Sequence, residues 1–288
     1  MRRREFLQLT ATAALPLTQP KDTFPTKARE RLAISTYPFR SLLKGGTALA
    51  QFAPTVRPKL DVTGIEPWSR HFQSTDAEYV RGLSRVFRDA GLHVVNIPVD
   101  DEVHLCGSAE KRKLGLAVYK KWVEAAVLLG SPSIRVHLPQ GETGKGIACA
   151  VSAFQELAQY GAARNVVINL ENDDPKTEAP ERIVEVIKDV NSPFLRALPD
   201  FCNSMLIHNN QETNQKEMEL LFPLAFNVSH VKDREIDNGK VYRVDLAPIF
   251  AIANRSGYKG YFSMEWEGEG NPYVETGKLI EASLRFIG

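Results

Sequence analysis

Short runs of apolar and β-branched residues alternate along the chain with longer segments in which apolar residues recur every three to four positions. The short runs predict eight β-strands, at Leu32–Phe39, Val62–Trp68, His93–Val99, Ser133–Leu138, Val166–Asn172, Arg196–Cys202, Asn227–Asp233 and Tyr261–Glu267. The longer segments predict helices at Asp76–Ala90, Ser108–Leu129, Gly146–Ala163, Pro180–Val190, Asn214–Leu224, Leu246–Ser256 and Pro272–Phe286. A less regular pattern predicts a helix around Thr47–Val56, and the polar segments Gln140–Lys145 and Met205–Gln215 are expected to be loops.

This alternation of strand and helix indicates the fold class. Parallel strands joined by helices form right-handed crossovers, and eight such units are the number that closes a barrel. We therefore predict an α/β fold, a (β/α)8 TIM barrel, in which residues 31–288 form a single domain. The alternative is an open doubly wound sheet, which is disfavoured because no GxGxxG motif follows the first predicted strand.

The first 30 residues do not share this pattern. The run Arg2-Arg3-Arg4-Glu5-Phe6-Leu7 precedes an alanine-rich apolar stretch from Leu9 to Leu17. Such an arrangement resembles a twin-arginine export signal, so we expect residues 1–30 to be a signal peptide and linker, and the protein to reach the periplasm or cell envelope. The alternative is a basic terminus that happens to precede a few alanines. No other segment approaches about 18 unbroken apolar residues, so no stable membrane insertion is expected after signal removal.

Charge and cysteine content narrow the classes of partner and cofactor. The formal net charge is +1, from 36 basic and 35 acidic residues, which argues against nucleic acid as a partner. The three cysteines, Cys106, Cys149 and Cys202, have no CxxC or Cys/His ligand spacing. We therefore expect no disulfide framework and interpret all three as buried or half-buried thiols.

The ends of the predicted strands carry the residues with candidate chemistry. The reacting groups of a barrel lie at the carboxyl ends of its strands, and strands five to eight end near Glu171, Asp200, His230 and Glu265. A carboxylate there is costly unless it is paired, hydrogen-bonded or bound to a metal. Each residue alone has an ordinary structural explanation, such as a helix cap or a buried histidine. Together they predict a site for one divalent metal ion, Mn²⁺, Mg²⁺, Co²⁺ or Zn²⁺.

These strand ends resemble those of the xylose isomerase-like barrel superfamily, in particular its sugar phosphate isomerase/epimerase group. The matching motifs, in a resemblance that extends from Leu32 to Gly288, are Asn169-Leu170-Glu171-Asn172, Asp200-Phe201-Cys202-Asn203, His230-Val231-Lys232-Asp233 and Ser263-Met264-Glu265-Trp266-Glu267-Gly268. In the ketose 3-epimerases of this superfamily, two glutamates bind the metal and exchange protons at opposite faces of the substrate carbon. The resemblance implies that Glu171 and Glu265 are this acid/base pair, with Asp200 and His230 completing the metal site.

Further residues at the strand ends are candidates for contacts with substrate: Glu66, Trp68, Arg135, His137, Asn203, Lys232 and Glu267. The resemblance implies that Lys232 faces a substrate oxygen. Arg135 and His137 share one face of a strand and are expected to hydrogen-bond the sugar, and Trp68 is expected to form an apolar wall. Asn203 departs from the family, where a histidine binds substrate in the epimerases and a second metal in DNA-repair endonucleases. This departure argues against a trinuclear endonuclease site.

Three functional hypotheses remain open. The first is a metal-dependent isomerase or epimerase that acts through an enediolate on a free sugar, keto-sugar or cyclitol. The second uses the same site but ends in elimination, as a 3-keto-sugar lyase or dehydratase or a keto-glycoside-cleaving enzyme. The third is a non-catalytic sugar-binding protein of the cell envelope. In each case the partner is a small-molecule carbohydrate, and the protein is expected to be a monomer or homodimer.

Overall fold

The computed structural model describes residues 19–21, 23–44, 48–101, 103–139, 146–174 and 176–288. Residues 1–18, which contain the motif of the expected export signal, lie outside this part of the chain. The same holds for Thr47 and for the expected loop Gln140–Lys145. The export signal therefore stays a prediction.

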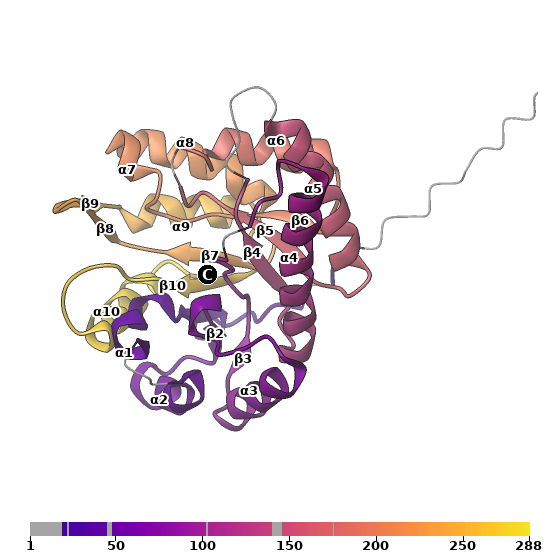
Figure 1. The fold of residues 1–288 in the computed structure, drawn as a ribbon. Coiled ribbons are helices and arrows are strands. Elements are labelled where there is room, and N and C mark those ends of the chain that lie inside the picture. The colour runs from indigo at the N-terminus through magenta and orange to yellow at the C-terminus, as the bar shows by residue number, and fades with distance from the viewer. Residues whose placement is uncertain (1–18, 22, 45–47, 102, 140–145, 175) are drawn as a thin grey trace, which may run out of the picture.

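Eight parallel strands form the centre of the molecule (Figure 1). They are β1 (Leu32–Ser35), β2 (Gly64–Glu66), β3 (His93–Val94), β4 (Ser133–Val136), β5 (Val167–Glu171), β6 (Leu195–Leu198), β7 (Val228–Val231) and β10 (Tyr261–Met264). Hydrogen bonds join β3, β2, β1, β10 and β7 into one arc, and β4, β5 and β6 into a second. Parallel bridges between Pro98 and Arg135 and between Asp200 and His230 connect the two arcs at both of their edges. The strands therefore meet in the order of a (β/α)8 barrel, which confirms the predicted fold.

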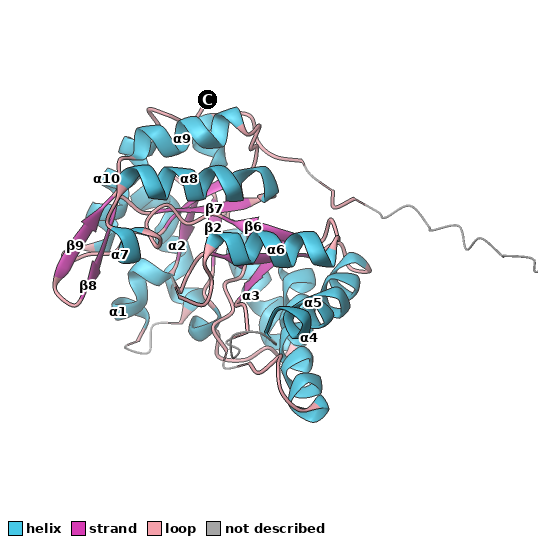
Figure 2. Cartoon of the chain, turned by 90° about the horizontal axis from the view of Figure 1, so that it is seen from above, coloured by secondary structure: helices cyan, strands magenta, loops and turns pink. Residues whose placement is uncertain are grey.

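Helices surround these strands, as the view from above shows (Figure 2). They are α1 (Arg40–Leu43), α2 (Leu49–Leu60), α3 (Ala77–Asp89), α4 (Ala109–Leu129), α5 (Gly146–Ala162), α6 (Pro180–Val190), α7 (Met205–His208), α8 (Gln211–Leu221), α9 (Leu246–Arg255) and α10 (Pro272–Ser283). Most predicted helices are confirmed to within a few residues. The agreement arises because residues that favour helix ends mark the boundaries in the sequence. In α4, for example, the Ser108 side chain caps the first turn and Gly130 ends the helix with a φ of 74°. The sequence pattern of α2 is less regular because Pro54 and Pro58 lie within it.

Two features after β6 and β7 differ from the prediction. Much of the expected loop Met205–Gln215 is helical, because Asn210 accepts a hydrogen bond from the Thr213 amide and starts α8 three residues early. Beyond β7 the chain forms an antiparallel hairpin of β8 (Arg234–Asp237) and β9 (Lys240–Arg243), which projects from the barrel (Figure 1). Its turn contains an Asn-Gly pair with positive φ at both residues, the dipeptide that favours a tight hairpin turn.

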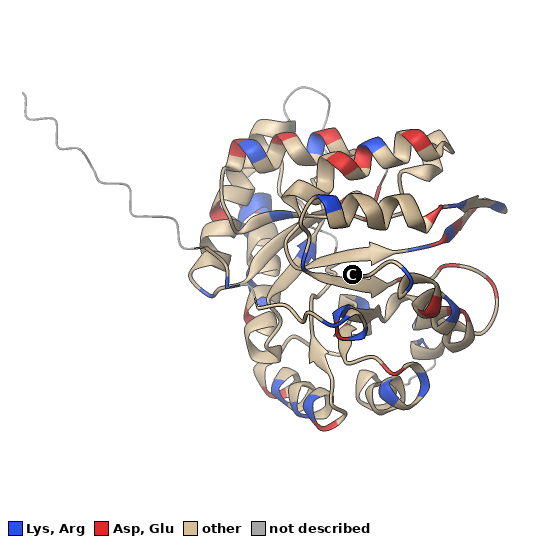
Figure 3. Ribbon diagram, turned by 180° about the vertical axis from the view of Figure 1, so that it is seen from behind, with Lys and Arg blue, Asp and Glu red and all other residues tan. Residues whose placement is uncertain are grey.

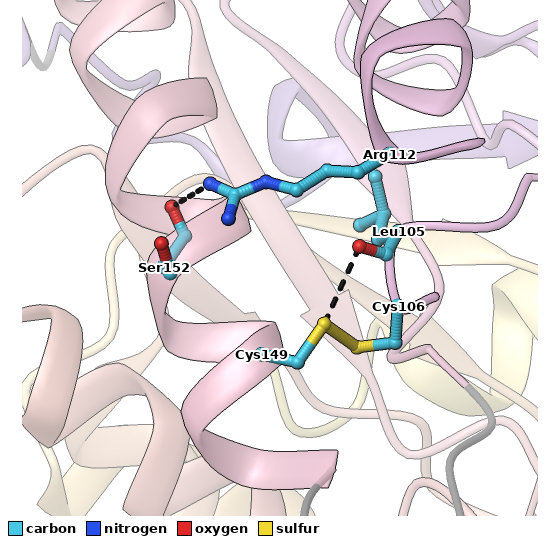
Figure 4. The surroundings of a disulfide bond; sticks show 5 residues. All are labelled: Leu105, Cys106, Arg112, Cys149 and Ser152. Carbon is cyan, nitrogen blue, oxygen red and sulfur yellow. Dashed lines mark hydrogen bonds between the residues drawn. A yellow bond between two sulfur atoms is a disulfide. The ribbon is translucent and has the colours of Figure 1, made fainter. Parts of the chain in front are cut away.

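The cysteine prediction is wrong for two of the three residues. Cys106 and Cys149 form a disulfide that ties the loop before α4 to the first turn of α5 (Figure 4). The two residues are 43 apart in sequence, yet the fold brings their Cα atoms to 5.6 Å. Sequence spacing carries no sign of such a pair, because the barrel and not the chain distance brings the two segments together. Cys202 is a buried free thiol, as expected.

Charged side chains lie mainly on the outer helices and the β8–β9 hairpin. In the view of Figure 3 basic and acidic residues are interspersed on these elements. This mixture agrees with the near-neutral charge of the sequence. Among the described residues, no helix is both long enough and apolar enough to cross a membrane.

Candidate active site

Four side chains from consecutive strands meet at the carboxyl end of the barrel. Glu171 is the last residue of β5, Asp200 follows β6, His230 lies in β7, and Glu265 follows β10. Each offers one possible ligand atom, and these four atoms all lie within 4.8 Å of one another. All four residues are buried. The structure therefore brings together the four predicted ligands, which we call the ligand group, at a spacing that suits one shared cation.

The orientation of His230 shows which of its nitrogens faces the ligand group. Its Nδ1 lies 2.6 Å from Glu171 Oε1 and 3.1 Å from Glu265 Oε2. Its Nε2, on the other side of the ring, lies 2.9 Å from Glu66 Oε2. Burial alone would lower the pKa of His230, but the three carboxylates outweigh it and raise this pKa well above its usual value. Nδ1 is thus the nitrogen that could bind a metal, while Nε2 donates to Glu66.

The chemistry of the ligand group fits a divalent cation. Asp200 Oδ1 accepts hydrogen bonds from the amides of Cys202 and Asn203, both at 2.8 Å, whereas its Oδ2 is buried and accepts none. Burial, only partly offset by Lys232, raises the pKa of Asp200 to about 8, and burial also raises the pKa of Glu171. A cation bonded to these carboxylates would compensate both the unused acceptor and the buried charge. Three carboxylates and one imidazole are ligands that Mn²⁺, Mg²⁺, Co²⁺ and Zn²⁺ accept.

A buried lysine, Lys232, lies beside the ligand group. Its Nζ is 3.6 Å from Asp200 Oδ2, 3.4 Å from Glu265 Oε2 and 3.0 Å from Glu267 Oε1. Burial would lower the pKa of Lys232, but the surrounding carboxylates raise it well above its usual value. Burial would raise the pKa of Glu265, but His230 and Lys232 outweigh it and hold this pKa below its usual range. Lys232 is therefore a permanent positive charge at the edge of the site.

A cavity of about 100 Å³, which we call the mouth cavity, adjoins the ligand group. Four residues predicted to contact substrate line it: Trp68, Arg135, Lys232 and Glu267. Five residues that were not predicted as site residues line it too: Tyr37, Pro98, Asp100, Asp173 and Glu235. Trp68 packs edge-on against Tyr37, with ring centroids 5.0 Å apart, and its Nε1 donates to Asp100. The indole thus forms a fixed wall of the mouth cavity.

Glu66 lies outside the mouth cavity. Its side chain is fully buried, its Oε1 accepts from Asn96 Nδ2 at 2.6 Å, and its Oε2 accepts from Ser263 Oγ at 2.6 Å and from His230 Nε2. Both carboxylate oxygens are satisfied by buried protein donors, so this placement argues against the predicted contact of Glu66 with substrate. The side chain points into the barrel interior, where it holds the His230 ring from the side away from the ligand group.

Asn203 does not line the mouth cavity either. It is buried, and its Oδ1 accepts a hydrogen bond from Lys232 Nζ at 3.0 Å. Its Nδ2 is buried as well and donates to no described protein group, so the expected contact with substrate stays a prediction. Through Oδ1, Asn203 fixes the position of Lys232, which does line the cavity.

His137 belongs to an ion-pair network beside the mouth cavity. Its Nε2 lies 3.0 Å from Asp100 Oδ1, and its Nδ1 lies 3.1 Å from Glu178 Oε2. Burial and Arg135 lower the pKa of His137, but Asp100 and Glu178 outweigh them and raise it to about 10. Arg135 extends the network to the ligand group, because its Nε lies 2.8 Å from Glu171 Oε2.

His137, Asp173 and Glu178 form a second group with spacing that could hold a metal. Two of its three members are partly exposed to solvent, the side chains of His137 at 31% and of Asp173 at 40%, whereas all four members of the ligand group are buried. Both oxygens of Glu178 also accept backbone hydrogen bonds, from Leu138 at 2.7 Å and from Asp174 at 3.0 Å. This second group is therefore better described as an ion-pair network than as a metal site.

Comparisons with known proteins place the chain in a family. The family model described as Xylose isomerase-like TIM barrel matches residues 58–288, which is most of the chain. The protein therefore belongs to the xylose isomerase-like TIM barrel family. No curated protein sequence matches it.

Solved structures show the same fold at low identity. A xylose isomerase-like TIM barrel protein from Mycobacterium smegmatis, in complex with magnesium, is 18% identical, with a TM-score of 0.65 over 83% of this chain and 87% of that one. D-allulose 3-epimerase from Methylomonas sp., in complex with D-allulose, is 17% identical, with a TM-score of 0.67 over 92% and 97%. The 3-keto-D-glucoside 4-epimerase from E. coli is 15% identical, with a TM-score of 0.64 over 82% and 94%. At such identities the likeness establishes the fold, and the chemistry has to be argued from the site.

Proposed function

We propose that the protein is a divalent-metal-dependent isomerase or epimerase that acts on a free sugar, keto-sugar or cyclitol. One observation carries this proposal: the buried ligand group, whose four candidate ligand atoms lie within 4.8 Å of one another. Membership of the family supports it, as do fold relatives named as sugar epimerases and as a magnesium complex.

The two glutamates of the ligand group supply the proton transfers in this proposal. Glu171 and Glu265 come from opposite sides of β7, and both contact His230 Nδ1, so they flank one small space. One carboxylate removes a proton from the carbon beside a carbonyl, and the other delivers a proton to the opposite face of that carbon. A divalent cation held by the ligand group would supply Lewis-acid polarisation of the substrate carbonyl.

The neighbouring cations hold these groups and the substrate in place. Arg135, ion-paired with Glu171 at 2.8 Å, keeps this carboxylate oriented toward the ligand group. Lys232 lines the mouth cavity with its ammonium between Glu265 and Glu267, where it donates a hydrogen bond to a substrate oxygen. Each positioned acid or base contributes about 10²–10⁴-fold to the rate.

The experiment that tests this proposal follows hydrogen exchange. Protein loaded with Mn²⁺ is incubated in D₂O with D-fructose and D-allulose, and deuterium at the carbon beside the carbonyl is measured by NMR. We expect deuterium incorporation in the wild type and its loss in Glu171→Gln and Glu265→Gln. Glu217→Gln is the matched control, because Glu217 is a buried glutamate of α8 outside the ligand group, and it should retain the exchange.

Two other outcomes would favour a different function. Release of 4-nitrophenol from a 4-nitrophenyl 3-keto-glucoside would show that proton removal ends in elimination, as in a lyase or keto-glycoside-cleaving enzyme. Absence of exchange together with sugar binding that is unaffected by EDTA and by Glu171→Gln would indicate a non-catalytic sugar-binding protein.

We also propose that the protein is exported to the periplasm or cell envelope. The Cys106–Cys149 disulfide supports this proposal, because disulfides persist mainly in oxidising compartments. The test is fractionation of bacterial cells that produce the full chain. Replacing Arg3 and Arg4 by lysine should keep the protein in the cytoplasm, and export that is unchanged by this replacement would contradict the proposal.

A further inference from the structure

A second, larger cavity, which we call the side cavity, adjoins the mouth cavity. Asp173 and Glu235 line both of them. The side cavity lies over the carboxyl ends of β4 and β5, where His137 and Glu178 also line it. A molecule held at the ligand group can therefore extend past Asp173 and Glu235 into the side cavity.

The sizes of the two cavities suggest more than one sugar ring. The mouth cavity measures about 100 Å³ and the side cavity about 780 Å³. Pockets that enclose a whole small-molecule ligand measure roughly 300–1,000 Å³. The mouth cavity alone is smaller than this range, whereas the side cavity lies within it. The space beside the ligand group is thus large enough for a further group attached to the reacting sugar.

The lining of the side cavity has the chemistry that binds a polyhydroxy ring. Glu235 Oε2 is buried, accepts no hydrogen bond, and has Lys232 Nζ at 3.5 Å. The Asp173 carboxylate is 40% exposed, and its nearest cations are His137 at 3.7 Å and Arg135 at 4.0 Å. Both carboxylates are therefore available to accept hydrogen bonds from hydroxyl groups.

Apolar side chains complete the lining. Leu138 and Leu206 face the side cavity together with Tyr119, which is buried. Carboxylate acceptors beside apolar surface match a ring that carries hydroxyl groups at its edge and C–H groups on its face. This combination favours a sugar ring over a purely apolar group.

The charge of the side cavity disfavours anionic groups. Five carboxylates line it, from Asp101, Asp173, Asp174, Glu178 and Glu235, and no lysine or arginine does so among the described residues. His137 is positively charged but is held between Asp100 and Glu178. Lys232 and Arg135 offset part of this charge from outside the side cavity, but a phosphate or carboxylate group would still meet an excess of carboxylates there, which favours an uncharged occupant.

We propose that the side cavity is a subsite for a second, uncharged sugar ring, joined by a glycosidic bond to the sugar at the ligand group. The substrate is then a neutral glycoside or disaccharide rather than a sugar phosphate. This inference rests on the proposed function, because it takes the ligand group as the place where the reacting sugar binds.

Three ketoses that differ only in the group on the oxygen at carbon 6 of fructose test this subsite. D-fructose, its 6-glucosyl derivative isomaltulose and D-fructose 6-phosphate bear hydrogen, a neutral ring or a phosphate at the same oxygen. Their Kd values are measured by calorimetry on Mn²⁺-loaded protein, with lactulose as a second glycosyl-fructose. We expect at least one glycosyl-fructose to bind about tenfold more tightly than D-fructose, the gain from one or two satisfied hydrogen bonds, and D-fructose 6-phosphate to bind more weakly.

Two variants of α7 show where the second ring binds. Leu206→Trp fills the side cavity and should reduce the ratio of the D-fructose Kd to the glycosyl-fructose Kd to about one. Ile207→Trp is the matched control, because the adjacent Ile207 is 48% exposed and lines a different cavity, and it should keep the wild-type ratio. Thermal unfolding of both variants verifies that they are folded.

The outcomes separate this inference from the proposed function. If D-fructose binds the Mn²⁺-loaded protein but neither glycosyl-fructose binds more tightly, the subsite is refuted and the proposed function stands. Tightest binding of D-fructose 6-phosphate, or an unchanged ratio in Leu206→Trp, also refutes it. If the protein does not bind Mn²⁺ at all, the proposed function fails and this inference fails with it.

Discussion

Replacing Glu66 by glutamine tests whether a residue with no access to substrate controls the metal site. The exchange preserves size but removes the negative charge opposite His230 Nε2. A metal at Nδ1 requires the remaining imidazole proton to reside on Nε2, and Glu66 accepts that proton in a hydrogen bond of 2.9 Å. Glutamine offers a neutral acceptor in its place. We therefore expect weaker metal binding in a folded protein.

The size of the effect follows from the contacts of Glu66. Its hydrogen bonds from Asn96 and Ser263 exist with and without a metal, so they largely cancel in the free energy of metal binding. The bond from His230 remains, and exchanging a charged acceptor for a neutral one weakens it by about 1–1.5 kcal/mol. This corresponds to about a tenfold increase in the Kd for Mn²⁺. Partners of metal-bound histidines typically contribute 10–100-fold, about the same magnitude.

The assay is calorimetric titration of EDTA-treated protein with Mn²⁺, with circular dichroism to verify the fold. Glu66→Gln should raise the Kd for Mn²⁺ tenfold or more. Glu217→Gln, the same exchange at another buried glutamate, should leave the Kd unchanged. A Kd within twofold of the wild type in Glu66→Gln, or an equal loss in Glu217→Gln, would refute the role assigned to Glu66.

Three more predictions concern other parts of the molecule. Changing both Cys106 and Cys149 to serine should lower the free energy of unfolding, measured by urea titration, by about 4 kcal/mol, the value for a disulfide that closes a loop of this length. Added reductant should then destabilise the wild type but not the double variant. Equal effects of the reductant on the two proteins would contradict the prediction. The folded-state pKa of His137 is about 10 against 6.5 unfolded, so its stabilising contribution is complete below pH 6.5 and is lost as the pH rises to 10. The free energy of unfolding of the wild type relative to His137→Gln should therefore fall over this range, and a flat difference would be evidence against the network. Lys232→Met should slow deuterium exchange into D-allulose about 100-fold while retaining one Mn²⁺ per chain, so an unchanged rate would exclude a role for the ammonium.

The sequence predicts the barrel and the ligand group because both follow from local patterns. The strands appear in the sequence as short apolar runs. In a (β/α)8 barrel the reacting residues lie at the carboxyl ends of the strands, so the residues that end or follow each run are the candidates. This is sufficient for Glu171, Asp200 and Glu265, which lie at or just beyond the ends of β5, β6 and β10. Glu66 shows the limit of this reasoning. It also ends a strand, but its side chain points into the barrel interior, a difference that depends on how the strands tilt and stagger.

Residues positioned by tertiary contacts could not be predicted in the same way. Glu235 reaches the mouth cavity from the β8–β9 hairpin, which the sequence analysis did not predict and whose direction depends on its packing against the barrel. Glu178 reaches His137 from the loop before α6. The Cys106–Cys149 pair joins the segment before α4 to α5, and the packing of those helices decides the distance between them. No pattern of spacing or period contains this information.

The most direct test of the account is the number of metal ions that the ligand group holds. EDTA-treated wild-type protein, titrated with Mn²⁺ in a calorimeter, should bind one ion per chain. The double variant Asp200→Asn, His230→Gln should bind none while it keeps the circular dichroism spectrum of the wild type. A wild-type protein that binds no Mn²⁺, or a double variant that still binds one ion per chain with unchanged affinity, would contradict the claim that these side chains share a cation.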